Sequence, residues 1–208
     1  MATWPSMTRH LPNILTVGRL ALTIVFLVII LYSPYSPSAE KRRLLLNIGF
    51  FIFVIAGLTD IVDGWLARRL QVATRFGRIV DPLADKVLVC GAFVCFAIVG
   101  VPLLFNLSER AHGILHWGVA GILIAREAYV TVLRQRAEAQ GFNFAATASG
   151  KLKMFFQAFA IGTVIVKMGH LQNTPWAYWF TSVVYTAMVG STIISGIRST
   201  QRKLERDA

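Results

Sequence analysis

Six long apolar runs constrain the fold of this 208-residue chain more than any other feature. They cover approximately residues 13–32, 45–68, 80–105, 113–135, 151–168 and 176–197. Each is close to the roughly 20 residues that an α-helix needs to cross a bilayer. With 55% hydrophobic residues and a mean hydropathy of +0.60, the chain is too apolar for an ordinary soluble domain. We therefore predict an all-α integral membrane protein, with six transmembrane helices in a single membrane domain over residues 1–208.

Basic residues gather between these runs and predict the orientation of the protein. The net charge is +11, but the cations are neither pooled in one domain nor interleaved with exposed aromatics, so we expect no binding to nucleic acid. Lysine and arginine are enriched in cytoplasmic loops and attract anionic lipids. This rule places both termini and the loops after the second and fourth runs in the cytoplasm. The basic cluster Lys41–Arg43 is an exception on the opposite side, and residues 1–12 predict a short interfacial segment.

Four aspartates lie where the second run ends and the third begins: Asp60, Asp63, Asp81 and Asp85. A carboxylate near hydrocarbon costs about 2.5 to 3.5 kcal/mol, so acids within a membrane segment predict a functional site. Spacings of three and four residues place each pair on one helix face. We expect a loop of about ten residues between two antiparallel helices, with Pro82 in the first turn of the second helix. The four carboxylates would then converge at the cytoplasmic edge of the membrane.

Such a cluster predicts a site for divalent cations. Neighbouring carboxylates repel one another unless a cation neutralises them. Oxygen ligands without His or Cys favour Mg²⁺ or Mn²⁺, and two such ions stabilise the attacking and leaving oxygens of a displacement at phosphorus. Gly64 and Gly77 leave room for a ligand, and Arg68 is placed to bind a diphosphate through two hydrogen bonds. The alternative is a set of structural acids paired with Arg68, Arg69, Arg78 and Lys86.

The pattern Asp60-x-x-Asp63-Gly64-x-x-Ala67-Arg68, followed by Gly77, Asp81 and Asp85, resembles the complete signature of the CDP-alcohol phosphotransferase family. The resemblance implies six transmembrane helices, a homodimer and a dinuclear metal centre. It also implies an activity, in which a phosphoalcohol passes from a CDP-linked donor to an acceptor hydroxyl and CMP is released.

The same resemblance implies roles for individual residues. Asp60, Asp63 and Asp81 would be metal ligands, and Asp85 would be both a ligand and the general base. The donor, CDP-diacylglycerol, would be bound by residues of the signature and of the first run: Asn13, Thr16, Gly64, Ala67, Arg68, Thr74 and Gly77. Asn13 and Thr16 belong to LPNILTVGRL, residues 11–20, which resembles the opening of bacterial phosphatidylglycerophosphate synthases. The alternative for Asn13 is a cap at the start of the first helix.

A second basic group predicts the acceptor. The segments AREAYVTVLRQRAEAQG and ATASGKLKMFFQ, residues 125–141 and 146–157, resemble a region of the same synthases. Arg126 lies inside an apolar run and must be paired, with Glu127 as the nearest acid. Cations in these segments form a basic pocket suited to the phosphate of glycerol 3-phosphate: Arg126, Arg134, Lys151 and Lys153. The alternative is the ordinary charge of a cytoplasmic loop.

We therefore expect a bacterial inner-membrane enzyme, active at the cytoplasmic face, that makes phosphatidylglycerophosphate from CDP-diacylglycerol and glycerol 3-phosphate. Within the family, inositol phosphate or phosphatidylglycerol remain alternative acceptors. Two alternatives come from other classes. Intramembrane prenyltransferases need more spans than this chain has. A cation transporter would favour acids near mid-span and broken helices, whereas these acids lie at span ends. His112 and His116, one turn apart, indicate a solvated pair at the outer interface rather than a metal site.

Overall fold

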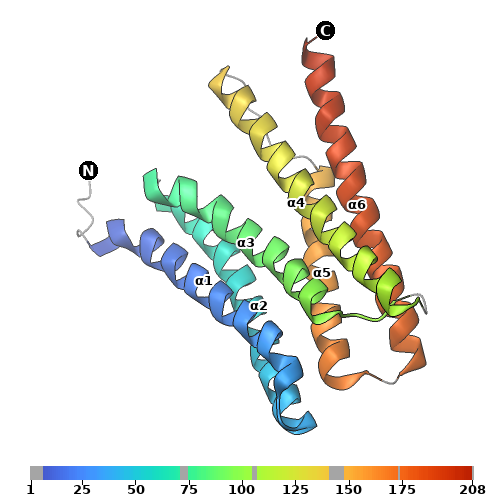
Figure 1. Ribbon diagram of the computed structural model, residues 1–208. Coiled ribbons are helices and arrows are strands. Elements are labelled where there is room, and N and C mark those ends of the chain that lie inside the picture. Colours follow the sequence, from blue (N-terminus) through green and yellow to red (C-terminus); the bar gives the residue numbers. More distant parts are fainter. Residues whose placement is uncertain (1–6, 71–74, 105–106, 141–147, 173, 208) are drawn as a thin grey trace. The chain divides into compact units, whose positions relative to one another are not determined.

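Six long α-helices make up the described part of the chain. The computed structural model describes residues 7–70, 75–104, 107–140, 148–172 and 174–207, and for 7–14, 60–70, 75–82, 138, 148 and 203–207 it describes the backbone alone. The helices are α1 (Met7–Tyr32), α2 (Ala39–Leu70), α3 (Arg75–Val99), α4 (Glu109–Ala139), α5 (Ala148–His170) and α6 (Pro175–Asp207), with a 3₁₀ turn η1 (Ser33–Tyr35) after α1 (Figure 1). Each predicted span corresponds to one helix, so the predicted all-α fold is confirmed.

The surface of these helices is that of a protein in lipid. Four described segments are long and apolar enough to cross a membrane: Leu15–Tyr35, Ala39–Thr59, Ser149–His170 and Pro175–Arg202. Large apolar side chains remain exposed along them, including Phe51 at 64% and Val183 at 65%. Lipid tails are as apolar as leucine, so such side chains need no protein cover. The chain is an all-α integral membrane protein.

The bounds of α3 differ from the predicted ones at its start. α3 begins at Arg75, and only residues 71–74, which lie outside the described residues, separate it from α2. The predicted ten-residue loop is therefore wrong, and Pro82 lies in the helix interior instead of its first turn. The polar residues before Asp81 mark where the helix leaves the hydrocarbon, but the helix itself continues beyond that point to Arg75.

At its other end α3 stops at Val99, short of the predicted residue 105. Gly100 has a φ of +74°, the left-handed conformation in which glycine ends many helices. The Gly100 and Val101 N–H groups both donate to the Phe96 carbonyl, at 2.9 and 3.0 Å. These two bonds satisfy a carbonyl that the end of the helix would leave without a partner.

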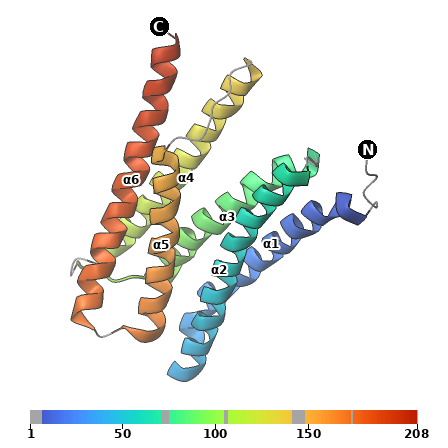
Figure 2. The same cartoon turned by 180° about the vertical axis from the view of Figure 1, so that it is seen from behind.

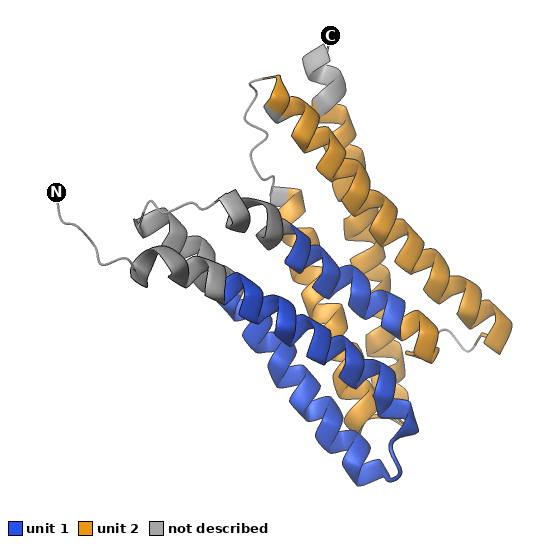
Figure 3. Ribbon diagram, turned by 60° about the vertical axis from the view of Figure 1, so that its left-hand side comes forward, with its two compact units in different colours: residues 1–95 blue, residues 96–208 orange. Residues whose placement is uncertain are grey.

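The chain divides into two compact units, residues 1–95 and 96–208 (Figure 3). In the first unit α1 and α2 form a helical hairpin, with Phe26 and Phe53 in contact at 5.5 Å between ring centroids. α3 approaches α1 closely at Gly91, where an added Cβ would come within 2.8 Å of a Leu27 methyl group. Small residues of this kind let membrane helices pack at short range. That residues 1–208 form a single membrane domain stays a prediction.

The second unit holds α4, α5 and α6 (Figures 1 and 2). α5 and α6 form a second hairpin, and α4 packs against α6. Its apolar core includes Ile161, Ile165 and Met188, none more than 1% exposed. Buried hydroxyls on α6 donate to the carbonyl four residues earlier: Thr181 to Ala177, Thr192 to Met188, and Ser199 to Ser195. The helix thereby satisfies these three hydroxyls without water.

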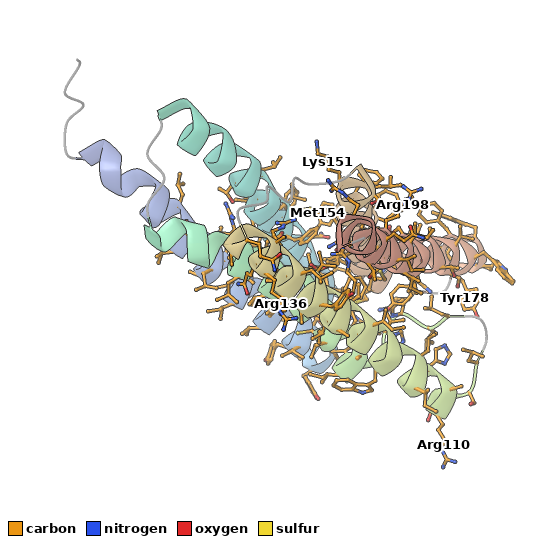
Figure 4. The ribbon with its side chains drawn as sticks, turned by 90° about the horizontal axis from the view of Figure 1, so that it is seen from above. Arg110, Arg136, Lys151, Met154, Tyr178 and Arg198 are labelled. Atoms are coloured by element: carbon orange, nitrogen blue, oxygen red, sulfur yellow. The ribbon has the colours of Figure 1, made fainter. Side chains whose placement is uncertain are left out.

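Cations gather where α4 and α6 end and α5 begins. Arg136 lies in the last turn of α4, Lys151 in the first turn of α5 and Arg198 in the last third of α6; Figure 4, a view from above, labels all three. All three cations are exposed side chains. This end of the second unit is therefore the one that the distribution of charge assigns to the cytoplasm.

Reporters at the two ends of α4 test this orientation. A reporter fused after Gln140 should give a cytoplasmic signal, because the basic end of the unit resists translocation. A reporter fused after Glu109, at the start of the same helix, should give the signal of the opposite side. At each position, the measurement is the ratio between the activity of a reporter that works only in the cytoplasm and that of a reporter that works only outside it. A cytoplasmic signal at both positions would show that α4 does not cross the membrane.

Candidate active site

The four aspartates lie at matching depths on two successive helices. Asp60 lies ten residues before the end of α2, and Asp85 lies ten residues after the start of α3. Asp63 and Asp81 are seven and six residues from the same two helix ends. At about 1.5 Å per residue, the members of each pair are therefore at similar distances from the link. α2 and α3 run in opposite directions from that link (Figure 1), so the sequence places acids at two equivalent levels.

The short link keeps the ends of these helices together. Four intervening residues span at most about 18 Å between Leu70 and Arg75, even when fully extended. Asp85 is the one aspartate of the signature whose side chain is described, and it is half-buried and takes part in interactions with its neighbours. The side chains of Asp60, Asp63 and Asp81 lie outside the described residues. The metal site and the catalytic role of Asp85 stay predictions.

The chemistry of the donor set fits a hard cation. The four aspartates of the signature offer carboxylate oxygens, which Mg²⁺ and Mn²⁺ prefer. Among the described side chains, no three His, Cys, Asp or Glu residues lie close enough together to hold a metal ion. The described side chains do not include those of Asp60, Asp63 and Asp81.

The predicted donor-binding residues lie around the same helix ends and on α1. Gly64, Ala67 and Arg68 belong to the last turns of α2, and Gly77 to the first turn of α3, while Thr74 lies outside the described residues. Asn13 is inside α1, which begins at Met7, so the alternative that it caps the first helix is wrong. The interfacial segment predicted over residues 1–12 is in part the first turns of this same helix. Thr16 is buried, at 1% exposure.

Arg19 is a buried cation that the sequence analysis did not single out. It is 2% exposed and lies on the same face of α1 as Thr16 and Thr23, which are 1% and 0% exposed. An arginine within a membrane span is costly unless its charge is compensated, and Arg19 does interact with its surroundings. The spacing of three and four residues between these polar side chains was the signal in the sequence.

The four cations predicted to bind the acceptor fall into two classes. Arg134 and Lys151 are exposed, as expected for ordinary loop charge. Lys153 is only 5% exposed, and the side chain of Arg126 is 12% exposed. Two of the four are thus held inside the protein, where a charge needs a partner.

Glu127 is that partner for both buried cations. Arg126 Nη1 donates to Glu127 Oε1 at 3.0 Å, and the Lys153 ammonium forms an ion pair with the same oxygen. The prediction that Glu127 pairs with Arg126 is confirmed. The alternative of ordinary loop charge is wrong for Lys153, because that side chain is buried and ion-paired across two helices.

A third helix joins this cluster through Ser195 of α6. Arg126 Nη2 donates to Ser195 Oγ at 2.5 Å, so the guanidinium contacts both its own helix and α6. Two cations and one carboxylate leave the cluster with one net positive charge, to which the exposed Arg134 and Lys151 add two. Such an excess favours the binding of an anion.

The predicted solvation of the two histidines is wrong. His112 and His116 are 6% and 1% exposed. The Leu104 N–H donates to His112 Nε2 at 2.8 Å, which ties the segment after α3 to α4. A ring nitrogen used in this way serves the fold. His116 packs against α6, where it meets the Tyr185 ring edge-on.

Comparison with known proteins places the chain in a family. The sequence model of the CDP-alcohol phosphatidyltransferases matches residues 9–195, which cover most of both units. The chain belongs to the CDP-alcohol phosphatidyltransferase family. This membership confirms the resemblance carried by the aspartate signature, and it excludes the prenyltransferase and transporter alternatives.

Relatives within the family are similar over most of their length. One, "Probable phosphatidylglycerophosphate synthase" of Mycobacterium tuberculosis (strain H37Rv), is 35% identical over 94% of this chain and 82% of its own. "CDP-diacylglycerol--glycerol-3-phosphate 3-phosphatidyltransferase" of Bacillus subtilis is 32% identical over 90% of this chain and 91% of its own. A protein of the same name from Salmonella choleraesuis is 35% identical over 75% of this chain and 76% of its own.

The Glu127 cluster leads to a test of stability. Glu127→Ala should leave two buried cations without a counter-ion and lower the free energy of unfolding by about 3 kcal/mol or more. Glu127→Gln, which keeps an acceptor oxygen, should cost less. The measurement is thermal unfolding of the purified protein in detergent.

Glu109→Ala provides the control, because Glu109 is exposed in the first turn of the same helix. It should change stability by less than about 1 kcal/mol. Equal melting temperatures for Glu127→Ala and the wild type would show that the ion pairs do not stabilise the second unit.

Proposed function

We propose that this family member transfers the phosphatidyl group of CDP-diacylglycerol to sn-glycerol 3-phosphate, giving phosphatidylglycerophosphate and CMP. The observation that carries the proposal is a cationic cluster in the second unit of a chain with the complete family signature. Glu127 compensates only one of the two buried charges, Arg126 and Lys153. Support for the acceptor also comes from the relatives, whose names specify glycerol 3-phosphate.

The four aspartates would hold two divalent cations, Mg²⁺ or Mn²⁺. When bound, such ions supply charge stabilisation for a diphosphate and for the leaving phosphate. Asp60, Asp63, Asp81 and Asp85 offer the oxygen ligands that these ions require. Arg68, in the last turn of α2, would bind the donor's diphosphate, and the small residues Gly64, Ala67 and Gly77 would leave room beside the backbone.

Asp85 would act as the general base. It takes the proton of the acceptor's primary hydroxyl, and the oxygen attacks the lipid-linked phosphorus of the donor. The new phosphate ester bond forms as the bond to the CMP oxygen breaks, and CMP leaves. The half-buried position of Asp85 is consistent with a base that remains accessible to substrate.

The acceptor's phosphate would be bound by Arg126, Arg134, Lys151 and Lys153. Charge-assisted hydrogen bonds from such cations are stronger than neutral ones, and a phosphate dianion matches the excess of positive charge. We expect the enzyme to be a homodimer in the bacterial inner membrane, with its active site at the cytoplasmic face where the exposed cations gather.

Acceptor choice tests the proposed function directly. The purified protein, given CDP-diacylglycerol and Mg²⁺, should release CMP with glycerol 3-phosphate. Inositol phosphate and phosphatidylglycerol should give little release, since the relatives' names specify glycerol 3-phosphate. The measurement is CMP formed per enzyme for each acceptor in turn. Release with inositol phosphate alone would retain the family and change the substrate.

Metal dependence and the base are tested together. Chelation should abolish CMP release, and added Mg²⁺ or Mn²⁺ should restore it. Asp85→Asn should lower kcat by about a hundredfold or more, because it removes the base, while donor affinity changes little. Glu40→Gln, an exposed acid at the start of α2, is the control and should be fully active. Normal turnover of Asp85→Asn would remove this residue from the role.

A further inference from the structure

Ser195 is a buried hydroxyl with an unusual partner for its helix. It is 0% exposed in α6, and its Oγ accepts a hydrogen bond from Arg126 Nη2 of α4 at 2.5 Å. The neighbouring hydroxyls Thr192 and Ser199, on the same face of α6, donate to carbonyls of their own helix. Ser195 therefore contacts a cation where its neighbours contact backbone.

Three contacts fix the side chain of Arg126. Its stem lies against α6 at Gly196, where an added Cβ would be 3.5 Å from Arg126 Cγ. Nη1 donates to Glu127, the next residue of α4, and Nη2 donates to Ser195 of α6, 69 residues further along the chain. A guanidinium is planar, so two hydrogen bonds and one packed stem leave it a single orientation.

The fixed guanidinium retains donors for another ligand. Arginine has five N–H groups, of which the described contacts use one on each Nη. The Nε atom is buried and has no hydrogen-bond partner among the described residues. Leaving a buried donor without an acceptor is unfavourable, so this edge of the guanidinium is suited to a further acceptor group.

We propose that Ser195 is a positioning residue for the acceptor: with Glu127 it holds the Arg126 guanidinium in the orientation that binds the acceptor's phosphate. The inference rests on the proposed function, since it assumes that Arg126 binds this substrate. Ser195 does not touch the acceptor and acts through Arg126. Fixing the cation before the substrate arrives removes the loss of side-chain freedom that binding would otherwise cause.

The test compares two serines on one face of α6. Ser195→Ala should raise the KM for glycerol 3-phosphate about three- to tenfold, which corresponds to the loss of one hydrogen bond and of the fixed orientation. Its kcat and its KM for CDP-diacylglycerol should stay unchanged. Ser199 lies one turn further along α6 and is 5% exposed. Ser199→Ala removes the same hydroxyl oxygen and should leave all three values unchanged. Ser195→Thr, which keeps the hydroxyl, should restore the acceptor KM.

A double-mutant cycle separates positioning from general support of the fold. In an Arg126→Ala background, Ser195→Ala should cause no further rise in the acceptor KM, because the residue through which it acts is absent. An equal rise in both backgrounds, or equal effects of Ser195→Ala and Ser199→Ala, would overturn the proposal. If Ser195→Ala does not fold, Ser195→Cys keeps most of the volume with a weaker acceptor, and its acceptor KM should rise in the same way.

The cycle also distinguishes this inference from the proposed function. If the wild-type protein releases CMP only with inositol phosphate, the choice of acceptor is wrong, and the same KM values are measured with that phosphate. A rise specific to Ser195→Ala would then still support the positioning role. If glycerol 3-phosphate is the acceptor and Ser195→Ala leaves its KM unchanged, the positioning role fails and the proposed function remains.

Discussion

A charge carried into the bilayer needs a partner within the protein, and in the second unit one carboxylate pairs with two buried cations. Glu127 binds Arg126 of its own helix and Lys153 of α5, and Arg126 also donates a hydrogen bond to Ser195 of α6. Without this oxygen, three helices would meet around two unpaired buried charges. The cluster therefore determines both how these helices assemble and how much positive charge remains for a ligand.

The sequence predicts the elements of this fold well because a membrane imposes a simple rule. Every backbone group must be bonded internally, so an apolar run of about 20 residues has one stable form, a helix. The ends of the helices follow another rule. α3 continues through the arginines before Asp81, since charged residues form helices outside the hydrocarbon as readily as apolar ones do within it. It ends where Gly100 adopts a positive φ, a local backbone feature that hydropathy does not report.

The candidate site was predictable where its chemistry is local and unpredictable where it depends on packing. Three- and four-residue spacing places the aspartates on helix faces, and the neighbouring Glu127 identifies the partner of Arg126. Lys153 comes from 26 residues away and Ser195 from 69, so no spacing rule connects them to the same guanidinium or carboxylate. The two histidines show the converse error. A position near a helix start indicated solvent, but His116 packs against Tyr185 of α6 and His112 bonds to Leu104.

The order of these contacts along the chain bears on how the protein enters the membrane. α4 is synthesised before α5 and α6, at a time when Lys153 and Ser195 do not yet exist. Arg126 and Glu127 are adjacent, so the helix carries its own neutralising charge into the translocon and needs no later segment for that purpose. Three hydroxyls of α6, those of Thr181, Thr192 and Ser199, likewise reach carbonyls of the same helix. α4 thus carries the counter-ion of its own buried arginine, and the polar contacts that join it to α5 and α6 form afterwards, as a second stage of assembly.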